Sequence, residues 1–311
     1  MKNEWFSRNC DNLYKHLHIC SSPVSRCTAA HLHDSEKYPL IAIMAATTTR
    51  RVKQPHVQKI ALFTLLLPSL IRSLDCGYRY VYVMGYDVGD PFYDSEAGMQ
   101  EVQAWFARQI AEPMRRNGIS ITLKPVKVFN PLKKPGPVFV AMAKPAYELG
   151  ANYFYRVNDD TEFRGRWPKL YVKALLEMRP PFGVVGPSSL GSVDAILTHD
   201  FVHRVHMEIF EQDYYPPELT DWWMDDWISR VYGKKRTLIA KEVAVMHHTY
   251  AHGQRYEVDR GNQRLVPNAL KKGRELIRQW MVKNGASPKE LKEFDDDVYL
   301  AKFAINQIRP S

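Results

Sequence analysis

The sequence has few cysteines and no long apolar run. Four cysteines occur among 311 residues, and three of them, Cys10, Cys20 and Cys27, precede the first predicted strand. Cys76 is the cysteine in the body of the chain, so a disulfide framework is excluded. The most apolar segment, 60–71, spans 12 residues and contains a proline, which makes it too short to cross a bilayer. We expect neither a membrane anchor nor a signal peptide in this chain.

Other missing features bear on function. The stretch AATTTRRVKQ, which follows the first predicted strand, has no glycine, whereas a nucleotidyltransferase normally carries a glycine-rich phosphate loop there. No Asn-x-Ser/Thr sequon occurs, which favours a cytoplasmic location. The sequence has neither a concentrated basic patch nor an RNP-like or helix-turn-helix pattern, and a nucleic-acid-binding protein would need one of these.

The composition is that of a soluble globular chain with an anionic partner. Hydrophobic residues make up 45% and charged residues 25%, a balance that excludes disorder, collagen and coiled coil. Lys and Arg number 43 against 34 for Asp and Glu, which gives a net charge of +9 and favours an anion as partner. The basic residues are spread along the chain, so a nucleotide or a diphosphate fits them as well as a polynucleotide.

Residues 1–37 form a polar lead segment without apolar periodicity. It is rich in Cys and His: Cys10, His16, His18, Cys20, Cys27, His31 and His33. Structural zinc sites usually bring their ligands in close pairs, and no two cysteines here have that spacing. The sequence favours a loosely packed tail and leaves a zinc site as the alternative.

From residue 38 onward, short apolar strands alternate with amphipathic helices, which is typical of an α/β domain with a mainly parallel sheet. We expect strands at 40–46, 80–85, 120–129, 153–158 and 182–186, and helices at 57–74, 99–117 and 138–149. No internal repeat and no linker rich in Gly or Ser divides the chain. We therefore predict a single domain.

An acidic cluster follows the predicted strand YFYRVN directly. It comprises Asp159, Asp160 and Glu162, at the carboxyl edge of a parallel strand, where α/β sheets place their ligands. Carboxylates packed together repel one another unless a cation relieves the repulsion, and Mg²⁺ and Mn²⁺ take oxygen ligands of this kind. The cluster predicts a metal site, and a solvated turn that caps the next helix is the alternative.

A second acidic pair, Asp225 and Asp226, lies in the segment TDWWMDDWISRVYG, whose apolar residues recur at helical spacing. An aspartate packed against indoles loses solvation, so its pKa rises toward the range in which it can accept a proton from a hydroxyl. The tryptophans Trp222, Trp223 and Trp227, with Tyr214 and Tyr215, offer faces on which a sugar ring could stack. The alternatives are a helix cap for the acids and core packing for the rings.

A third element, EVAVMHHTYAHGQRYEVDRG, is an apolar strand that ends in His247 and His248, with Arg255 and Arg260 close behind. Imidazole can complete a carboxylate-bound Mn²⁺ site, and the arginines suit a diphosphate. We expect the segment 249–272 to close over a bound diphosphate as a lid. The alternatives are histidines that lie on the surface without a ligand and a basic surface loop that does not close over one.

These three elements, in this order, resemble the GT-A class of nucleotide-sugar-dependent glycosyltransferases over residues 38–256. The resemblance implies a GT-A fold, Rossmann-like with a mainly parallel central sheet flanked by helices, in which the lead segment 1–37 precedes a glycosyltransferase domain at 38–270 and a helical extension at 271–311. It also implies a DxD motif that holds a divalent metal on the donor diphosphate.

The segment RVNDDTEF looks like the DDDT version of that motif found in Fringe-like and related β-glycosyltransferases. Asn158, Asp159 and Asp160 stand on its three positions. By this resemblance Asp160 is the ligand of Mn²⁺ or Mg²⁺ and Asn158 faces the ribose, with Asn replacing the first Asp of the motif. Glu162 could alternatively form a D-x-E pair with Asp160.

The remaining site residues are also carried by the resemblance. The segment MDDW resembles the x-E-D motif of inverting members, with Asp225 orienting the acceptor and Asp226 as the base, and either His247 or His248 completes the metal site. Candidate contacts to the nucleotide are Thr47, Thr48, Arg50, Asp87, Lys144 and Arg255.

The resemblance therefore predicts a metal-dependent glycosyltransferase, a hexosyl- or pentosyltransferase. It moves a sugar with inversion from a nucleoside diphosphate donor, taken as a UDP-sugar, to a hydroxyl of a glycan, protein or lipid. The alternatives are a catalytically inactive relative that only binds glycan or nucleotide, and a nucleotidyltransferase. Relatives of this class in eukaryotes work in the Golgi lumen behind an anchor, which this sequence would match only as a truncated form.

Overall fold

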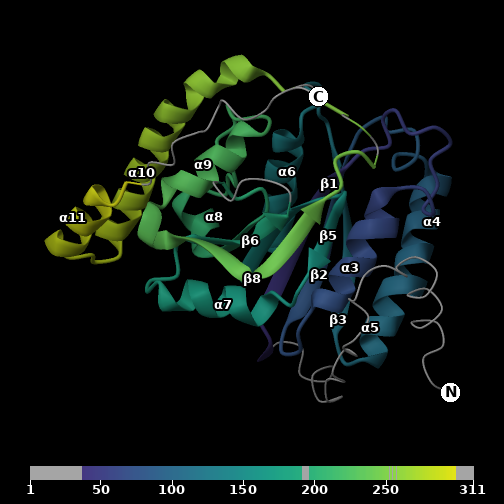
Figure 1. The fold of residues 1–311 in the computed structure, drawn as a ribbon, viewed down its shortest axis with the longest axis horizontal. Coiled ribbons are helices and arrows are strands. Elements are labelled where there is room, and N and C mark those ends of the chain that lie inside the picture. The colour runs from purple at the N-terminus through teal and green to yellow at the C-terminus, as the bar shows by residue number, and fades with distance from the viewer. Residues whose placement is uncertain (1–36, 191–195, 252, 254, 257, 299–311) are drawn as a thin grey trace.

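The computed structural model describes residues 37–190, 196–251, 253, 255–256 and 258–298 (Figure 1). The Cys and His residues of the lead segment lie outside these residues, and so does His252 of the expected lid. Cys76 is disulfide-bonded, a bridge that we did not predict from the number and spacing of the cysteines. Within the described residues, no helix combines the length and the apolarity that a membrane span requires.

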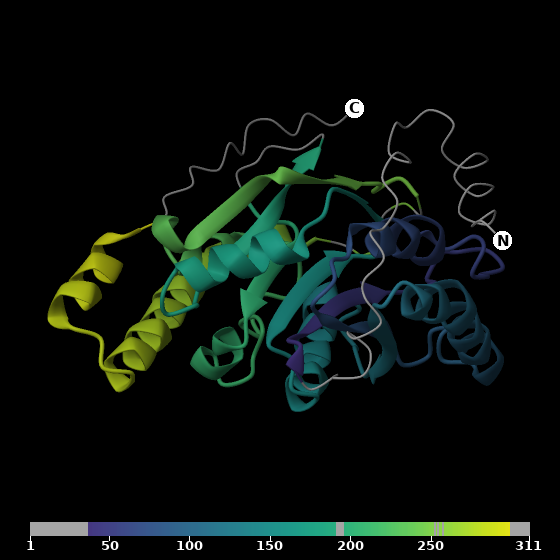
Figure 2. The same cartoon turned by 90° about the horizontal axis from the view of Figure 1, so that it is seen from below.

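A single eight-stranded sheet organises the described residues, with the strand order β3-β2-β1-β4-β7-β6-β8-β5. Four of its seven neighbouring pairings are parallel and three are antiparallel. The strands are β1 (Leu40–Thr47), β2 (Arg79–Asp87), β3 (Ser120–Val128), β4 (Tyr153–Asn158), β5 (Thr161–Arg164), β6 (Val184–Leu190), β7 (Asp200–His203) and β8 (Thr237–His247). The sheet curls in its β8 half (Figures 1 and 2).

Both faces of the sheet are covered by helices, so β1 is apolar at nearly every position. Successive side chains of a strand point to opposite faces: Ile41 and Ile43 join one core, and Ala42 and Met44 join the other. The first core packs on α3 (Leu67–Ser73), α4 (Glu96–Phe106), α5 (Glu112–Arg116) and α7 (Pro168–Glu177). The second packs on α6 (Pro135–Glu148), α8 (Val205–Ile209), α9 (Trp223–Val231), α10 (Val266–Lys283) and α11 (Pro288–Asp296).

The chain changes direction across the sheet between β1 and β4. Strands β2 and β3 lie on one side of β1, and the helices that precede them, α3 and α4, cover one face. Strand β4 lies on the other side of β1, and the helix that precedes it, α6, covers the opposite face. A crevice opens at such a switch point, outside the carboxyl ends of the two strands. Thr47 ends β1 there, and Asp159 follows the last residue of β4.

The predicted single α/β domain is confirmed. The mainly parallel character holds for the half of the sheet built by β1 to β4, and the other half is mixed. Two short strands were not predicted, β5 and β7, because four residues carry too little alternation to read. The expected boundary at 270/271 falls inside α10, whose Ala269 and Ile277 both belong to the second core.

Candidate functional site

The acidic turn between β4 and β5 lies at the switch point and is held by neighbouring strands. Asp159 is 3% exposed, and the Thr47 hydroxyl at the end of β1 donates a hydrogen bond to its Oδ2 at 2.8 Å. Arg255, from the segment after β8, donates two hydrogen bonds to the same carboxylate, at 2.6 and 2.5 Å. Three elements far apart in the sequence therefore meet at one carboxylate.

Two carboxylate–histidine pairs lie beside Asp159. Strand β5 runs antiparallel to β8 and places Thr161 opposite His247. As a result Asp160 Oδ1 lies 2.7 Å from His247 Nε2, and Glu162 Oε2 lies 3.0 Å from His248 Nε2. Both carboxyl groups are nearly inaccessible to solvent. The sequence left open which histidine joins the acidic turn, and the structure gives each histidine its own acid.

The Asp160–His247 pair carries a perturbed imidazole. Burial on its own lowers the pKa of His247, but its hydrogen bond to Asp160 and the charges of Asp160, Asp225 and Asp159 raise the pKa above the ordinary value on balance. The pKa of His247 is therefore raised by the surplus of negative charge around its imidazole. A divalent cation or a guanidinium would relieve the same charge.

The residues at the turn fit a divalent cation only in part. Within the described residues no group of three or more His, Cys, Asp or Glu side chains is arranged to hold a metal ion. The donor set is one carboxylate oxygen of Asp160 and one imidazole nitrogen of His247. Mg²⁺ and similar cations are commonly bound by one or two carboxylates together with substrate phosphates and water. Such a pair suits a cation that arrives with a diphosphate rather than a permanently bound ion.

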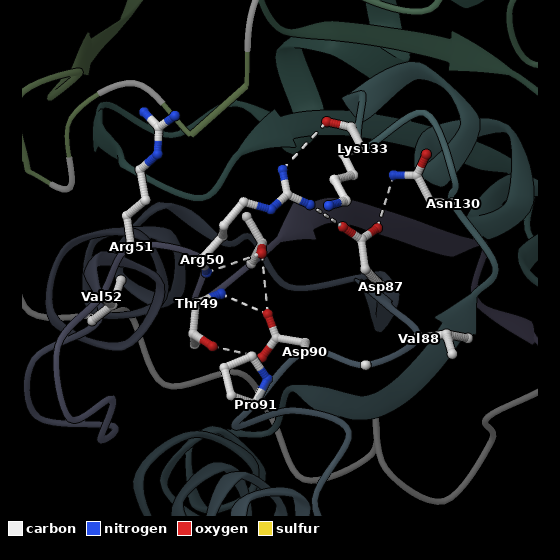
Figure 3. Close-up of a pocket in the computed structure, with 12 residues that line it drawn as sticks. Thr49, Arg50, Arg51, Val52, Asp87, Val88, Asp90, Pro91, Asn130 and Lys133 are labelled. Carbon is white, nitrogen blue, oxygen red and sulfur yellow. Dashed lines mark hydrogen bonds and ion pairs between the residues drawn. The ribbon is translucent and has the colours of Figure 1, made fainter.

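A cleft of 370 Å³ lies at the carboxyl edge of the sheet. It is lined by the ends of β1 and β2 and by the loop after β3, and Arg50 and Asn130 reach Asp87 from opposite sides (Figure 3). Arg50 pairs with Asp87 at 2.8 Å, and it also donates a hydrogen bond to the Arg255 carbonyl oxygen at 3.0 Å. Asp87, Arg50, Arg255 and Asp159 therefore form a continuous chain of contacts from the cleft to the acidic turn.

The sequence motif MGYDVGD contains a second aspartate, Asp90, which sequence reasoning missed. Asp90 accepts hydrogen bonds from the Thr49 amide at 2.7 Å and from the Thr49 hydroxyl at 2.6 Å (Figure 3). The Thr48 hydroxyl and the amides of Phe92 and Tyr93 donate to it as well. Asp90 thus holds the loop that follows β1. Thr48 lines the cleft and also donates one of the hydrogen bonds that hold this loop.

Helix α9 presents its two acids in different surroundings. Burial raises the pKa of Asp225 to about 6, against the opposing effect of Arg156, and it raises the pKa of Asp226 to about 7, against Arg230. Asp225 accepts a hydrogen bond from Arg156, whereas Asp226 lies 3.7 Å from Arg230 one turn along the helix. Both acids are therefore buried and paired, and both have pKa values in the range of a general base.

Two further expected nucleotide contacts are Lys144 and Asn158. Lys144, on α6, lines a separate hollow of 520 Å³ together with Glu148, Glu211 and Asp213. The structure therefore places Lys144 at a different hollow from the cleft beside Asp87, and a contact of Lys144 with a phosphate stays a prediction. Asn158 ends β4 opposite Ala46 of β1, one residue before the turn.

The expected aromatic platform belongs mostly to the core. Tyr214 and Tyr215 are fully buried, and both donate hydrogen bonds to Asp200. Trp227 is 1% exposed, and its indole nitrogen donates to the carbonyl oxygen of Ala269. These three rings cannot stack on a sugar, because the helices that cover the sheet enclose them. Trp222 remains half-buried at the start of α9.

The expected lid is not one loop. Its second half is helical from residue 260 onward, first as the 3-10 segment Arg260–Leu265 and then as α10, which contains Lys271 and Lys272. Its first half is attached to the site by Arg255, and Trp223 of α9 donates a hydrogen bond to the Asp259 carbonyl oxygen at 2.9 Å. The part that can bear on a ligand is therefore the short stretch before residue 260.

Sequence reasoning also missed Arg156, which lies on β4 three residues before Asp159 and is 1% exposed. Its guanidinium donates to Asp200 at 2.8 Å and to the Tyr215 hydroxyl at 2.9 Å, and also to Asp225 and to the Thr198 carbonyl oxygen. An arginine in an otherwise apolar strand was the available signal, because a buried arginine requires several acidic or polar partners.

Comparisons with known proteins give only distant similarities. No family model and no curated protein matches the chain. One solved structure of TarS from S. aureus is 12% identical over 82% of this chain, with a TM-score of 0.43. TarS 1–349 from the same organism in complex with UDP is 11% identical over 81% of this chain, with a TM-score of 0.41. The chain spans 41% of the first of these structures and 77% of the second. Because the TM-scores are low, we infer nothing about activity from TarS.

Proposed function

We propose that this chain is a glycosyltransferase of the GT-A type that uses a nucleoside diphosphate sugar, taken as a UDP-sugar, and a divalent cation. The observation that supports the proposal is the chain of contacts from Asp87 through Arg50 and Arg255 to Asp159. It joins a cleft of nucleoside size to a compact group of buried acids at the carboxyl edge of the sheet. A ligand with a neutral end and an anionic middle suits this arrangement.

The donor would lie along that chain. Its nucleoside would occupy the cleft beside Asp87, and its diphosphate would lie between Arg50 and the acidic turn, since guanidinium groups bind phosphate oxygens in a bidentate manner. Asp160 and His247 would hold Mn²⁺ or Mg²⁺ together with the diphosphate oxygens. The bound cation would stabilise the negative charge that develops on the departing nucleoside diphosphate.

The acceptor chemistry belongs to α9. One of the two α9 carboxylates would take the proton from an acceptor hydroxyl of a glycan, protein or lipid as that oxygen attacks the anomeric carbon. Attack from the face opposite to the leaving group gives inversion. A carboxylate whose pKa burial has raised to about 6 or 7 is ionised in part or in full at neutral pH and is a stronger base than an exposed aspartate.

The test of donor binding is calorimetry with UDP and with GDP, each in the presence of Mn²⁺ and then of excess EDTA. We expect binding that requires the cation, and we expect Asp160→Ala to abolish it. Asp295→Asn is the matched control, because it removes an exposed carboxylate of α11 that pairs with Arg278. Equal binding in EDTA and in Mn²⁺, with Asp160→Ala resembling the wild type, would contradict the metal assignment.

The test of activity is a panel of nucleotide sugars assayed for Mn²⁺-dependent hydrolysis and for transfer to glycan acceptors. Turnover of one donor with an inverted product supports the proposal. Tight, cation-dependent nucleotide binding without turnover of any donor would instead indicate a binding protein that has lost catalysis.

A further inference from the structure

One buried arginine connects the two acidic elements of the site. Arg156 lies on β4, the strand that leads into Asp159 and Asp160, and it hydrogen-bonds Asp225 in the first turn of α9. Asp200 on β7 and the Tyr215 hydroxyl accept hydrogen bonds from Nε of the same guanidinium. The planar guanidinium therefore fixes the position of α9 relative to the acidic turn.

The surroundings of Asp225 include the groups of the proposed donor site. The pKa of Asp225 is affected by the charges of Arg156 on β4, Asp200 on β7 and His247 on β8. The charge of Asp225 in turn raises the pKa values of Tyr215, of Tyr256 in the segment after β8, and of its neighbour Asp226. Tyr256 is also influenced by Asp160 and Asp221. The contact that links Asp225 to the acidic turn is its hydrogen bond with Arg156, on the strand that leads into that turn.

Asp226 has different neighbours. The charged groups that act on it are Arg230, four residues along the same helix, and Asp225. Its side chain is 5% exposed, against 13% for that of Asp225. Asp226 therefore pairs within its own helix, whereas Asp225 is the more exposed acid and pairs with β4, the strand that leads into the acidic turn.

We propose that Asp225 is the base that deprotonates the acceptor and that Arg156 is its positioning residue, which fixes the Asp225 carboxylate toward the acidic turn. The inference rests on the proposed glycosyltransfer and reverses the roles that the sequence resemblance implies for Asp225 and Asp226. Arg156 does not touch the substrate. It acts through Asp225, by holding one carboxylate oxygen and leaving the other for the acceptor hydroxyl.

Arg156 has a second effect, on protonation. Desolvation raises the pKa of Asp225, and the guanidinium opposes that rise. Without the guanidinium the carboxyl group would stay protonated to a higher pH and could not accept a proton near neutrality. Arg156 therefore contributes both the orientation and the ionisation of the base.

The first experiment compares kcat of Asp225→Asn and Asp226→Asn, with the donor identified by the hydrolysis panel. We expect kcat to fall on the order of 10²-fold or more in Asp225→Asn, as is usual for loss of a general base, with the KM for the donor little changed. The loss in Asp226→Asn should be at least about tenfold smaller. A larger loss in Asp226→Asn than in Asp225→Asn would overturn the proposal.

The second experiment compares pH profiles of kcat for Arg156→Lys and for its matched control Arg230→Met, which removes the arginine beside Asp226. We expect the acidic limb of Arg156→Lys to move to higher pH by about one unit, since a lysine cannot reproduce the several directed hydrogen bonds of the guanidinium, and we expect Arg230→Met to keep the wild-type limb. Unchanged limbs in both variants, or a shift confined to Arg230→Met, would overturn the proposal.

Folding failures and failures of the proposed function remain distinguishable from failure of this inference. Arg156→Met combined with Asp200→Asn removes one buried charge of each sign, and its circular dichroism and its unfolding transition report whether the fold survives. If it folds, the acidic limb should still move to higher pH, because Arg156 affects the pKa of Asp225 more than Asp200 does, and a wild-type limb would overturn the proposal. Absence of turnover by the wild type with every donor refutes the proposed function itself, and with it the inference, whereas wild-type turnover with the reversed Asp225 and Asp226 pattern refutes only the inference.

Discussion

Removal of the Arg255 guanidinium should strongly destabilise the folded protein, because the acidic turn depends on it for charge compensation. The Arg255 side chain is 12% exposed and that of Asp159 is 5% exposed. The two hydrogen bonds between them are short and charge-assisted. Asp160 lies 3.8 Å from the same guanidinium and keeps its closer contact with His247, so Arg255→Met removes the cation that pairs with the buried Asp159 carboxylate.

The magnitude follows from the burial of the pair. Breaking a buried ion pair by removing one partner costs about 3–5 kcal/mol, because the remaining charge is left without compensation. An unfolding entropy of about 2.1 cal/mol/K per residue, applied to 311 residues, gives about 0.65 kcal/mol/K. The midpoint of thermal unfolding of Arg255→Met should therefore fall by about 5 to 8 °C at neutral pH.

The assay is calorimetric unfolding of the wild type, Arg255→Met and the control Arg116→Met. Arg116 also pairs with a carboxylate, Glu112, but its side chain is 72% exposed, so its removal should cost less than about 1 kcal/mol. A double variant with Asp159→Asn should be less destabilised than the two single variants added together, since the pair is removed as a unit. If Arg255→Met and Arg116→Met unfold at the same temperature, the acidic turn does not depend on Arg255.

Three further predictions concern other parts of the molecule. Burial raises the pKa of Asp226 from 3.8 to about 7, so between these pH values the native state binds one proton that the unfolded state has lost, and the stability of the wild type falls as pH rises. Urea unfolding should therefore show that Asp226→Asn gains about 2 kcal/mol of stability relative to the wild type between pH 5 and pH 7. Parallel pH dependences of the two proteins would contradict this. Calorimetry should show that Arg50→Ala weakens nucleotide binding about tenfold or more, whereas Lys144→Ala, which removes a cation from the separate hollow, leaves it unchanged; the reverse order would refute the position of the donor. A Cβ at Gly136 would lie 2.8 Å from the backbone oxygens of Leu219 and Thr220. Gly136→Ala should therefore push α6 away from the segment before α9 and lower the free energy of unfolding by about 1–3 kcal/mol. Wild-type stability of this variant in urea would show that the backbone moves there without cost.

The parallel half of the sheet could be predicted from local pattern. Strands β1, β2 and β4 are buried on both faces and therefore appear as mainly apolar runs, which Arg156 interrupts in β4. The helices between them show the helical period on the face that packs on the sheet. Because ligands bind at the carboxyl ends of such strands, the sequence also indicated the acidic turn at Asp159 and Asp160 and the cleft residues Arg50 and Asp87.

The sequence by itself determined which residue types meet at the site, and the tertiary structure decided which atoms pair. The antiparallel pairing of β5 with β8 assigned His247 to Asp160 and His248 to Glu162, and strand pairing is a long-range choice that no local spacing encodes. Packing likewise enclosed Tyr214 and Tyr215 in the core and directed Lys144 into a different hollow. Arg156 is the strongest case, since a single arginine acquires its role only when β4, β7 and α9 come together around it and exclude the water that would otherwise solvate its charge.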